Sequence, residues 1–261
     1  MTQKSNWLKI ALIQTELFWE DPISNRAMFT SKIEQIREAV DIIVLPEMFT
    51  SGFTMSPDNI KKEESLLTIT WMKQMASKYN AAIVGSIVFK EDNFNYNRLF
   101  FIEPNGETFT YDKKHTFTLA GEHVKYTAGS QRLIVDYKGF KICPLICYDL
   151  RFPVWSRNTE NFDILLYAAN WPTPRINAWD SLLKARAIEN MVYCIGVNRI
   201  GTDKIGHNYP GHTSCYNPQG GLMGISKKEE ILIVEINKNE IDSLRTKLPF
   251  LEDRDQFNLI D

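Results

Sequence analysis

The stretch Lys141-Ile-Cys-Pro-Leu-Ile-Cys147-Tyr-Asp-Leu-Arg-Phe-Pro153 passes from a nearly unbroken apolar segment into polar residues. The apolar part predicts a buried strand, and the polar residues predict a turn directly after it. Strand ends are where α/β folds expose reactive groups, so Cys147 is expected at such an end. A thiol there becomes a nucleophile if a neighbouring base or cation stabilises the thiolate, because an unperturbed cysteine is mostly protonated at neutral pH.

The alternative is that Cys147 is a small buried hydrophobe, as most free cysteines are. Cys143, Cys194 and Cys215 are expected to be such residues. Four dispersed cysteines are too few for the disulfide framework of a small secreted protein, so reduced thiols are expected.

Further runs of strand length occur along the chain, and several are continuously apolar, which predicts strands covered on both faces. These runs are 40–45, 82–89, 99–102, 133–135, 164–168, 193–198 and 231–235. Helix-like stretches lie at 25–39, 66–79 and 178–190. The mixture predicts an α/β fold.

Turn residues at 104–106, 137–139 and 218–220 separate short strands as in hairpins, so a mixed sheet is expected. The absence of a linker or repeat predicts one domain over residues 1–261. The segment 247–261 lacks regular apolar spacing and is expected to wrap a surface or meet a partner subunit.

The composition argues against several classes of partner. With 30 basic and 32 acidic residues and a net charge of −2, the chain offers no basic stripe for nucleic acid. Its longest apolar runs are strand-sized, which argues against a membrane span. No signal peptide is recognisable at the N-terminus, so a cytoplasmic location is expected. No Gly-rich phosphate loop indicates a cofactor, and no second Cys/His pair follows Cys143 and Cys147, so no metal is expected.

Two other segments carry candidate chemistry. Glu47 follows a buried strand and a proline, where a carboxylate either caps a helix, pairs with an arginine or acts as a base. The segment 111–123 packs two lysines, two histidines and two acids between strands, and by itself would be taken for a solvated loop.

Together, Pro46-Glu47, Tyr111-Asp-Lys113 and Ile146-Cys147-Tyr-Asp-Leu-Arg-Phe-Pro153 resemble the three signature segments of the nitrilase-like carbon–nitrogen hydrolases, in the family's order. The resemblance runs over nearly the whole chain. It includes the landmarks Asn170-Trp171, 186–190 and 217–220. Within the family the chain looks most similar to bacterial omega-amidases.

The resemblance implies that Cys147 is the nucleophile, Glu47 the general base and Lys113 the cation that stabilises the oxyanion. Lys113 is preferred to Lys114 because the motif places its lysine two residues after the tyrosine. Glu122 matches less rigidly as the second glutamate, which orients the lysine and the substrate.

Four residues are expected to bind substrate: Tyr148, Arg151, Asn170 and Trp171. Arg151 has a second interpretation, because its place inside the cysteine motif also favours a structural salt bridge. Trp171 is the best candidate for a pocket wall.

The fold implied by the resemblance is an αββα sandwich with two stacked mixed sheets flanked by helices, extended across a homodimer. The implied reaction is hydrolysis of a small dicarboxylic acid monoamide, such as 2-oxoglutaramate, to the acid and ammonia through a cysteine thioester. A nitrilase or a carbamoyl-amide hydrolase with the same three residues is one alternative. A catalytically silent ligand-binding or scaffold protein is another.

Histidines offer a weaker alternative, a Cys–His pair formed by Cys147 with His115, His123, His207 or His212. Arg186 and Glu189, at helical spacing, are expected to form a solvated or interface pair.

Overall fold

The strands form two six-stranded sheets in the computed structural model, which describes residues 6–258. The first sheet has the order β14-β1-β2-β3-β4-β5, and β1, β2 and β3 run parallel at its centre. Its strands are β1 (Trp7–Gln14), β2 (Ile42–Val44), β3 (Ala82–Glu91), β4 (Phe94–Ile102), β5 (Thr108–Asp112) and β14 (Glu230–Asn237).

The second sheet has the order β13-β12-β9-β8-β7-β6, with β7, β8 and β9 parallel at its centre. Its strands are β6 (Val135–Tyr137), β7 (Phe140–Ile146), β8 (Ile164–Ala168), β9 (Tyr193–Val197), β12 (Thr213–Tyr216) and β13 (Leu222–Ser226). A separate hairpin pairs β10 (Ile200–Thr202) with β11 (Asn208–Pro210).

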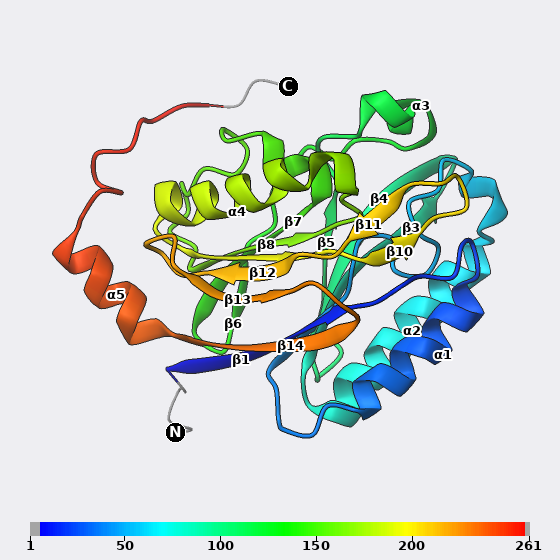
Figure 1. The fold of residues 1–261 in the computed structure, drawn as a ribbon, viewed down its shortest axis with the longest axis horizontal. Coiled ribbons are helices and arrows are strands. Elements are labelled where there is room, and N and C mark those ends of the chain that lie inside the picture. The colour runs from blue at the N-terminus through cyan, green and yellow to red at the C-terminus, as the bar shows by residue number, and fades with distance from the viewer. Residues whose placement is uncertain (1–5, 259–261) are drawn as a thin grey trace.

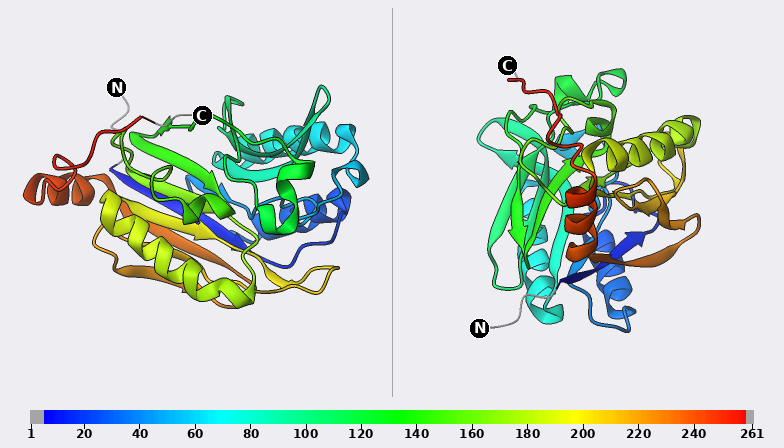
Figure 2. Two further views of the ribbon diagram at one scale, coloured as in Figure 1. Left: turned by 90° about the horizontal axis from the view of Figure 1, so that it is seen from above. Right: turned by 90° about the vertical axis from the view of Figure 1, so that its left-hand side faces the viewer.

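Helices cover the outer faces of the two sheets (Figures 1 and 2). α1 (Pro22–Glu34) and α2 (Lys62–Tyr79) lie on the first sheet, and α4 (Ile176–Asn190) lies on the second. The order of layers is therefore helix, sheet, sheet, helix, which confirms the expected α/β sandwich of two mixed sheets. The short α3 (Glu122–Lys125) lies at one end, and α5 (Lys238–Lys247) extends from the other.

Burial on both faces explains why the central strands are largely apolar, and β1, which was not among the predicted runs, also shows this arrangement. In β1, Leu8, Ile10 and Leu12 point into the core between the sheets, whereas Ala11 and Ile13 pack under α1 and α2. Successive side chains leave a strand on opposite faces, so a strand covered on both sides needs apolar residues at every position.

The three predicted turns join β4 to β5, β6 to β7 and β12 to β13, each pair antiparallel, which confirms the hairpins. The C-terminal segment packs its buried Leu251 against the chain, and Arg254 Nη1 donates to Asn161 Oδ1 at 2.9 Å. Leu251 and Arg254 therefore attach this segment to the chain's own surface, residues 255–258 are exposed, and residues 259–261 of the predicted segment lie outside the described residues. None of the helices between residues 6 and 258 has the length and apolar character that crossing a bilayer requires.

Candidate active site

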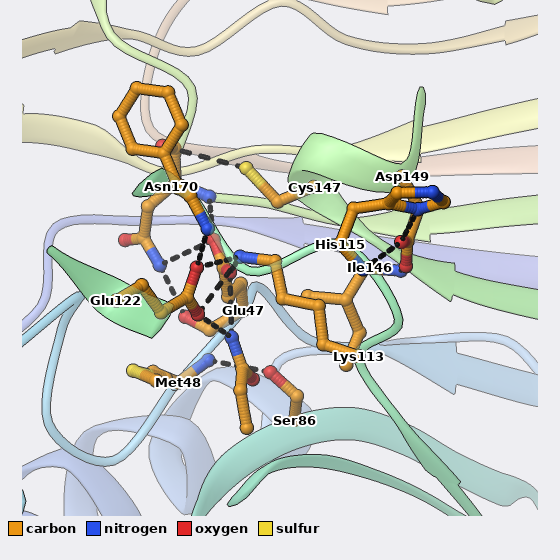
Figure 3. A network of polar contacts seen from close by, with 12 residues as sticks. Glu47, Met48, Ser86, Lys113, His115, Glu122, Ile146, Cys147, Asp149 and Asn170 are labelled. Carbon is orange, nitrogen blue, oxygen red and sulfur yellow. Dashed lines mark hydrogen bonds and ion pairs between the residues drawn. The ribbon is translucent and has the colours of Figure 1, made fainter. Parts of the chain in front are cut away.

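Polar side chains that follow four strands meet in one network of contacts (Figure 3). Glu47 comes three residues after β2, and Lys113 directly follows β5, both in the first sheet. Cys147 directly follows β7 and Asn170 follows β8, both in the second sheet. The carboxyl ends of parallel strands are the usual place for a site in an α/β fold, and here two sheets contribute to the same one.

Lys113 lies between two carboxylates, and all three side chains are at most 1% exposed. Its Nζ atom is 2.8 Å from Glu47 Oε1, 3.0 Å from Glu122 Oε1 and 2.9 Å from Glu122 Oε2. Lys114, by contrast, places its ammonium over the Trp155 ring. The lysine that the motif selects is therefore the one that joins Glu47 and Glu122.

Two asparagines fix the carboxylate of Glu47. Asn97 Nδ2 donates to Glu47 Oε1 at 2.8 Å and to Glu122 Oε1 at 3.2 Å. The backbone N–H of Asn170 donates to Glu47 Oε2 at 2.9 Å, and Asn170 Nδ2 donates to the Glu47 carbonyl at 2.6 Å. Each carboxylate oxygen of Glu47 thus has donors that limit its rotation.

Lys113 and the two glutamates shift one another's pKa values. Burial alone would lower the pKa of Lys113, but Glu122 and Glu47 raise it above its usual value, so the ammonium stays protonated. Burial raises the pKa of Glu122, and the charge of Glu47 adds to that effect, while Lys113 opposes it. Glu122 Oε2 also accepts a hydrogen bond from the backbone N–H of Phe117. Phe117 lines the cavity described below, so this bond connects the cavity wall to the charged cluster.

Cys147 has a left-handed backbone, with φ of 43°, an arrangement that costs a residue with a Cβ about 1–2 kcal/mol. Such strain at a strand–turn junction is common where a reactive side chain must be presented. Burial, followed by the charge of Glu47, raises the pKa of the Cys147 thiol well above its usual value, while Lys113 lowers it. The resting group is therefore the thiol, and its Sγ lies 3.9 Å from the Asn170 carbonyl oxygen.

A cavity of about 240 Å³ opens at Cys147 and Lys113. All four residues predicted to bind substrate line it: Tyr148, Arg151, Asn170 and Trp171. Lining residues that the sequence did not single out for substrate include Phe53, Phe117, Leu119, Arg175, His207 and Tyr209. Glu47 and Glu122 lie behind this wall rather than on it.

Two arginines of the pocket rest on aromatic rings. The guanidinium of Arg151 lies 5.0 Å from the centre of the Trp171 ring, and that of Arg175 lies 5.1 Å from the centre of the Phe117 ring. Within residues 6–258 neither arginine has a carboxylate within ion-pair distance. The prediction that Arg151 forms a structural salt bridge is therefore wrong for the described residues. Cation–π contacts hold both groups in place while leaving their N–H donors available to a ligand.

The described residues place one histidine, His207, in the pocket with Cys147, but it pairs with an aspartate rather than with the thiol. His115 Nδ1 lies 2.8 Å from Asp149 Oδ1, His212 pairs with Asp180, and His207 pairs with Asp203. His123 lies on α3, and none of the four histidines hydrogen-bonds the Cys147 thiol within residues 6–258.

Arg186 and Glu189 do pair, at 2.8 Å, but Arg186 is buried and its Nη2 also donates to the Leu150 carbonyl at 2.8 Å. The solvated alternative is therefore wrong for Arg186, which supports the turn that carries Cys147, and the interface alternative stays a prediction. In the described part of the chain, His, Cys, Asp and Glu side chains form no group of three suited to a metal ion.

The sequence model of the carbon–nitrogen hydrolase family matches residues 9–246, so the chain belongs to that family and hydrolyses carbon–nitrogen bonds. Its relatives include the omega-amidase YafV of Escherichia coli K12, which is 42% identical over 97% of this chain and 98% of YafV. The 2-oxoglutaramate amidase of Bacillus subtilis is 32% identical over 94% of this chain and 96% of its own.

Among solved structures, XC1258 from Xanthomonas campestris, a superfamily member with an arsenic adduct in its active site, superposes with a TM-score of 0.94. It is 36% identical, and the match covers 97% of this chain and 99% of XC1258.

Proposed function

We propose that this chain is an omega-amidase that hydrolyses the terminal amide of a small dicarboxylic acid monoamide, with 2-oxoglutaramate as the representative substrate. The observation that carries the proposal is the buried Glu47–Lys113–Glu122 cluster beside the pocket-lining Cys147. The names of the two amidase relatives support the same choice.

The reaction begins when Glu47 accepts the proton of the Cys147 thiol as Sγ attacks the amide carbonyl carbon. The raised pKa of the thiol requires such a base, because few thiolates exist at rest. Lys113 and the backbone N–H of Tyr148 stabilise the oxyanion that forms. A well-placed donor of this kind contributes about 3 kcal/mol.

Collapse of the tetrahedral intermediate breaks the C–N bond. Glu47 returns its proton to the departing nitrogen, which leaves as ammonia, and a thioester remains on Cys147. Glu47 then takes a proton from water as the water attacks the thioester, and returns that proton to Sγ as the C–S bond breaks, which releases the carboxylic acid and restores the thiol. Glu122 keeps Lys113 protonated and in place throughout.

The pocket supports a small substrate with a second charged end. Its volume of about 240 Å³ is below the range of about 300–1,000 Å³ typical of pockets for drug-sized ligands. Arg151 and Arg175 supply guanidinium donors without carboxylate partners among residues 6–258. A guanidinium binds a carboxylate through two parallel hydrogen bonds, so these arginines suit the free carboxylate of a monoamide.

The test is ammonia release from 2-oxoglutaramate, with glutamine, a simple aliphatic nitrile and a Cys147→Ala variant as controls. Selective turnover of 2-oxoglutaramate that disappears in Cys147→Ala is expected. Preferred hydrolysis of the nitrile would replace the proposal with a nitrilase. The absence of turnover on any amide would favour another acyl substrate or a silent binding protein.

The homodimer, the cytoplasmic location and the single domain over residues 1–261 remain predictions from the sequence. Light scattering of the purified chain tests the first, because it gives the mass of the assembly directly.

A further inference from the structure

A third buried carboxylate, Asp149, lies behind the nucleophile and outside the Glu47–Lys113–Glu122 cluster. Asp149 is fully buried and accepts four hydrogen bonds. Its Oδ2 accepts from the Ile146 backbone N–H at 3.0 Å and from the Tyr111 hydroxyl at 2.7 Å. Its Oδ1 accepts from the His115 backbone N–H at 3.0 Å and from His115 Nδ1 at 2.8 Å.

These donors belong to two different segments of the active site. Ile146 immediately precedes Cys147 at the end of β7 in the second sheet. Tyr111 and His115 flank Lys113, at the end of β5 in the first sheet. One carboxylate therefore joins the segment that carries the nucleophile to the segment that carries the oxyanion-stabilising lysine (Figure 3).

The surroundings leave the Asp149 side chain little freedom. Trp155 Nε1 donates to the Tyr111 hydroxyl at 3.0 Å, and the His115 ring stacks on Phe152 with centroids 3.7 Å apart. On the far side of the turn, Arg186 holds the Leu150 carbonyl. Cys147 needs this support because its left-handed backbone is retained only where neighbours over-determine it.

We propose that Asp149 is a positioning residue, which keeps Cys147 Sγ and Lys113 Nζ in register by bonding the backbone beside each of them. This inference rests on the proposed amidase reaction. It assigns Asp149 no contact with substrate.

Asp149→Asn tests the proposal with almost no change of shape. Whichever way the amide turns, its NH₂ faces a backbone N–H, that of Ile146 or that of His115, so one donor loses its acceptor. Because a displacement of about 1 Å at a reacting group can cost about 100-fold in rate, kcat should fall by about that factor with little change in KM. Loss of kcat alone separates misalignment from loss of binding.

The matched control is Asp163→Asn. Asp163 is equally buried and lies at the opposite end of β7, where it accepts the Lys141 backbone N–H and pairs with Lys238 and Arg245. This variant should lose thermal stability and keep the wild-type kcat. If Asp163→Asn lost as much kcat as Asp149→Asn, the loss would be a general consequence of removing a buried charge, and Asp149 would have no specific positioning role.

Tyr111→Phe serves if Asp149→Asn fails to fold, because it removes one donor and leaves the carboxylate. It should lower both kcat and the rate at which iodoacetamide alkylates Cys147, with KM unchanged. A folded Asp149→Asn or Tyr111→Phe with wild-type kcat and alkylation rate would overturn the proposal. Alkylation needs no substrate. The alkylation rate therefore tests the positioning role of Asp149 even if the wild-type enzyme hydrolyses none of the amides tried.

Discussion

Lys113 Nζ lies 2.8 Å from Glu47 Oε1, although 66 residues separate the two in sequence. The ion pair joins the ends of β5 and β2 within the first sheet, whereas Cys147 and Asn170 approach from the second. Asn170, from the second sheet, donates hydrogen bonds to Glu47, from the first, so the site depends on how the two sheets are stacked. The chemistry of the proposed reaction is thus tied to the core between the sheets.

Lys113→Gln should destabilise the protein as well as abolish turnover, because it leaves Glu47 and Glu122 buried without their counter-ion. Removing one partner of a buried pair costs about 3–5 kcal/mol. The pKa of Glu122, already raised, rises further without Lys113. The folded variant then holds a proton that the unfolded chain has released, so its stability should increase as pH falls from neutral toward the unfolded carboxyl value.

Urea unfolding at several pH values measures this effect, with Lys138→Gln as the control. Lys138 pairs with Asp41 at a partly exposed surface position, where such a pair contributes less than about 1 kcal/mol. Equal destabilisation by the two variants, or no pH dependence in Lys113→Gln, would contradict the charge arrangement described here.

Glu47→Gln should lower turnover and, at the same time, lower the pKa of the Cys147 thiol. Burial and then the Glu47 charge raise that pKa, so a neutral side chain removes one cause and leaves Lys113 to favour the thiolate. Losing a general base typically costs about 100- to 10,000-fold in rate. Ultraviolet titration of the thiolate, with Cys147→Ala as the blank, should show a lower midpoint in Glu47→Gln. A higher midpoint would mean that Glu47 does not act on the thiol electrostatically.

Arg151→Met and Arg175→Met should weaken the binding of substrates that carry a free carboxylate. A hydrogen bond to a charged group contributes about 1.5–3 kcal/mol, or about 10- to 100-fold in KM. Methionine keeps an apolar stem against the Trp171 or Phe117 ring. Steady-state kinetics on 2-oxoglutaramate and on a neutral aliphatic amide should show the loss only for the former. A parallel loss on both amides would assign the arginines a structural role.

The sequence predicted most of the fold, because the elements that decide it are the most strongly patterned. Continuous apolar runs marked central strands such as β2 and β8, and turn residues marked the three hairpins. α5 was not predicted, because it is largely polar and buries only Ile241. Helix boundaries shifted by a few residues, as at α1, which begins at Pro22 after the Asp21 cap.

The sequence also indicated which side chains form the candidate site, but not which residues hydrogen-bond to them and fix their positions. Glu47, Lys113, Glu122 and Cys147 come together in the structure, and their catalytic roles stay predictions. Asn97 was missed, since one polar residue in a strand has no signal until its neighbours are known. The salt bridge weighed for Arg151 was wrong within residues 6–258, because the arginine's neighbour is an aromatic ring rather than a carboxylate.

The central claim is that Cys147 carries the acyl group during hydrolysis, and mass spectrometry of enzyme quenched with acid during turnover of 2-oxoglutaramate tests it most directly. The peptide that contains Cys147 should gain the mass of the acyl group, and hydroxylamine should remove that mass. Ammonia release without any acyl mass on this peptide, or with the mass on another residue, would contradict the account.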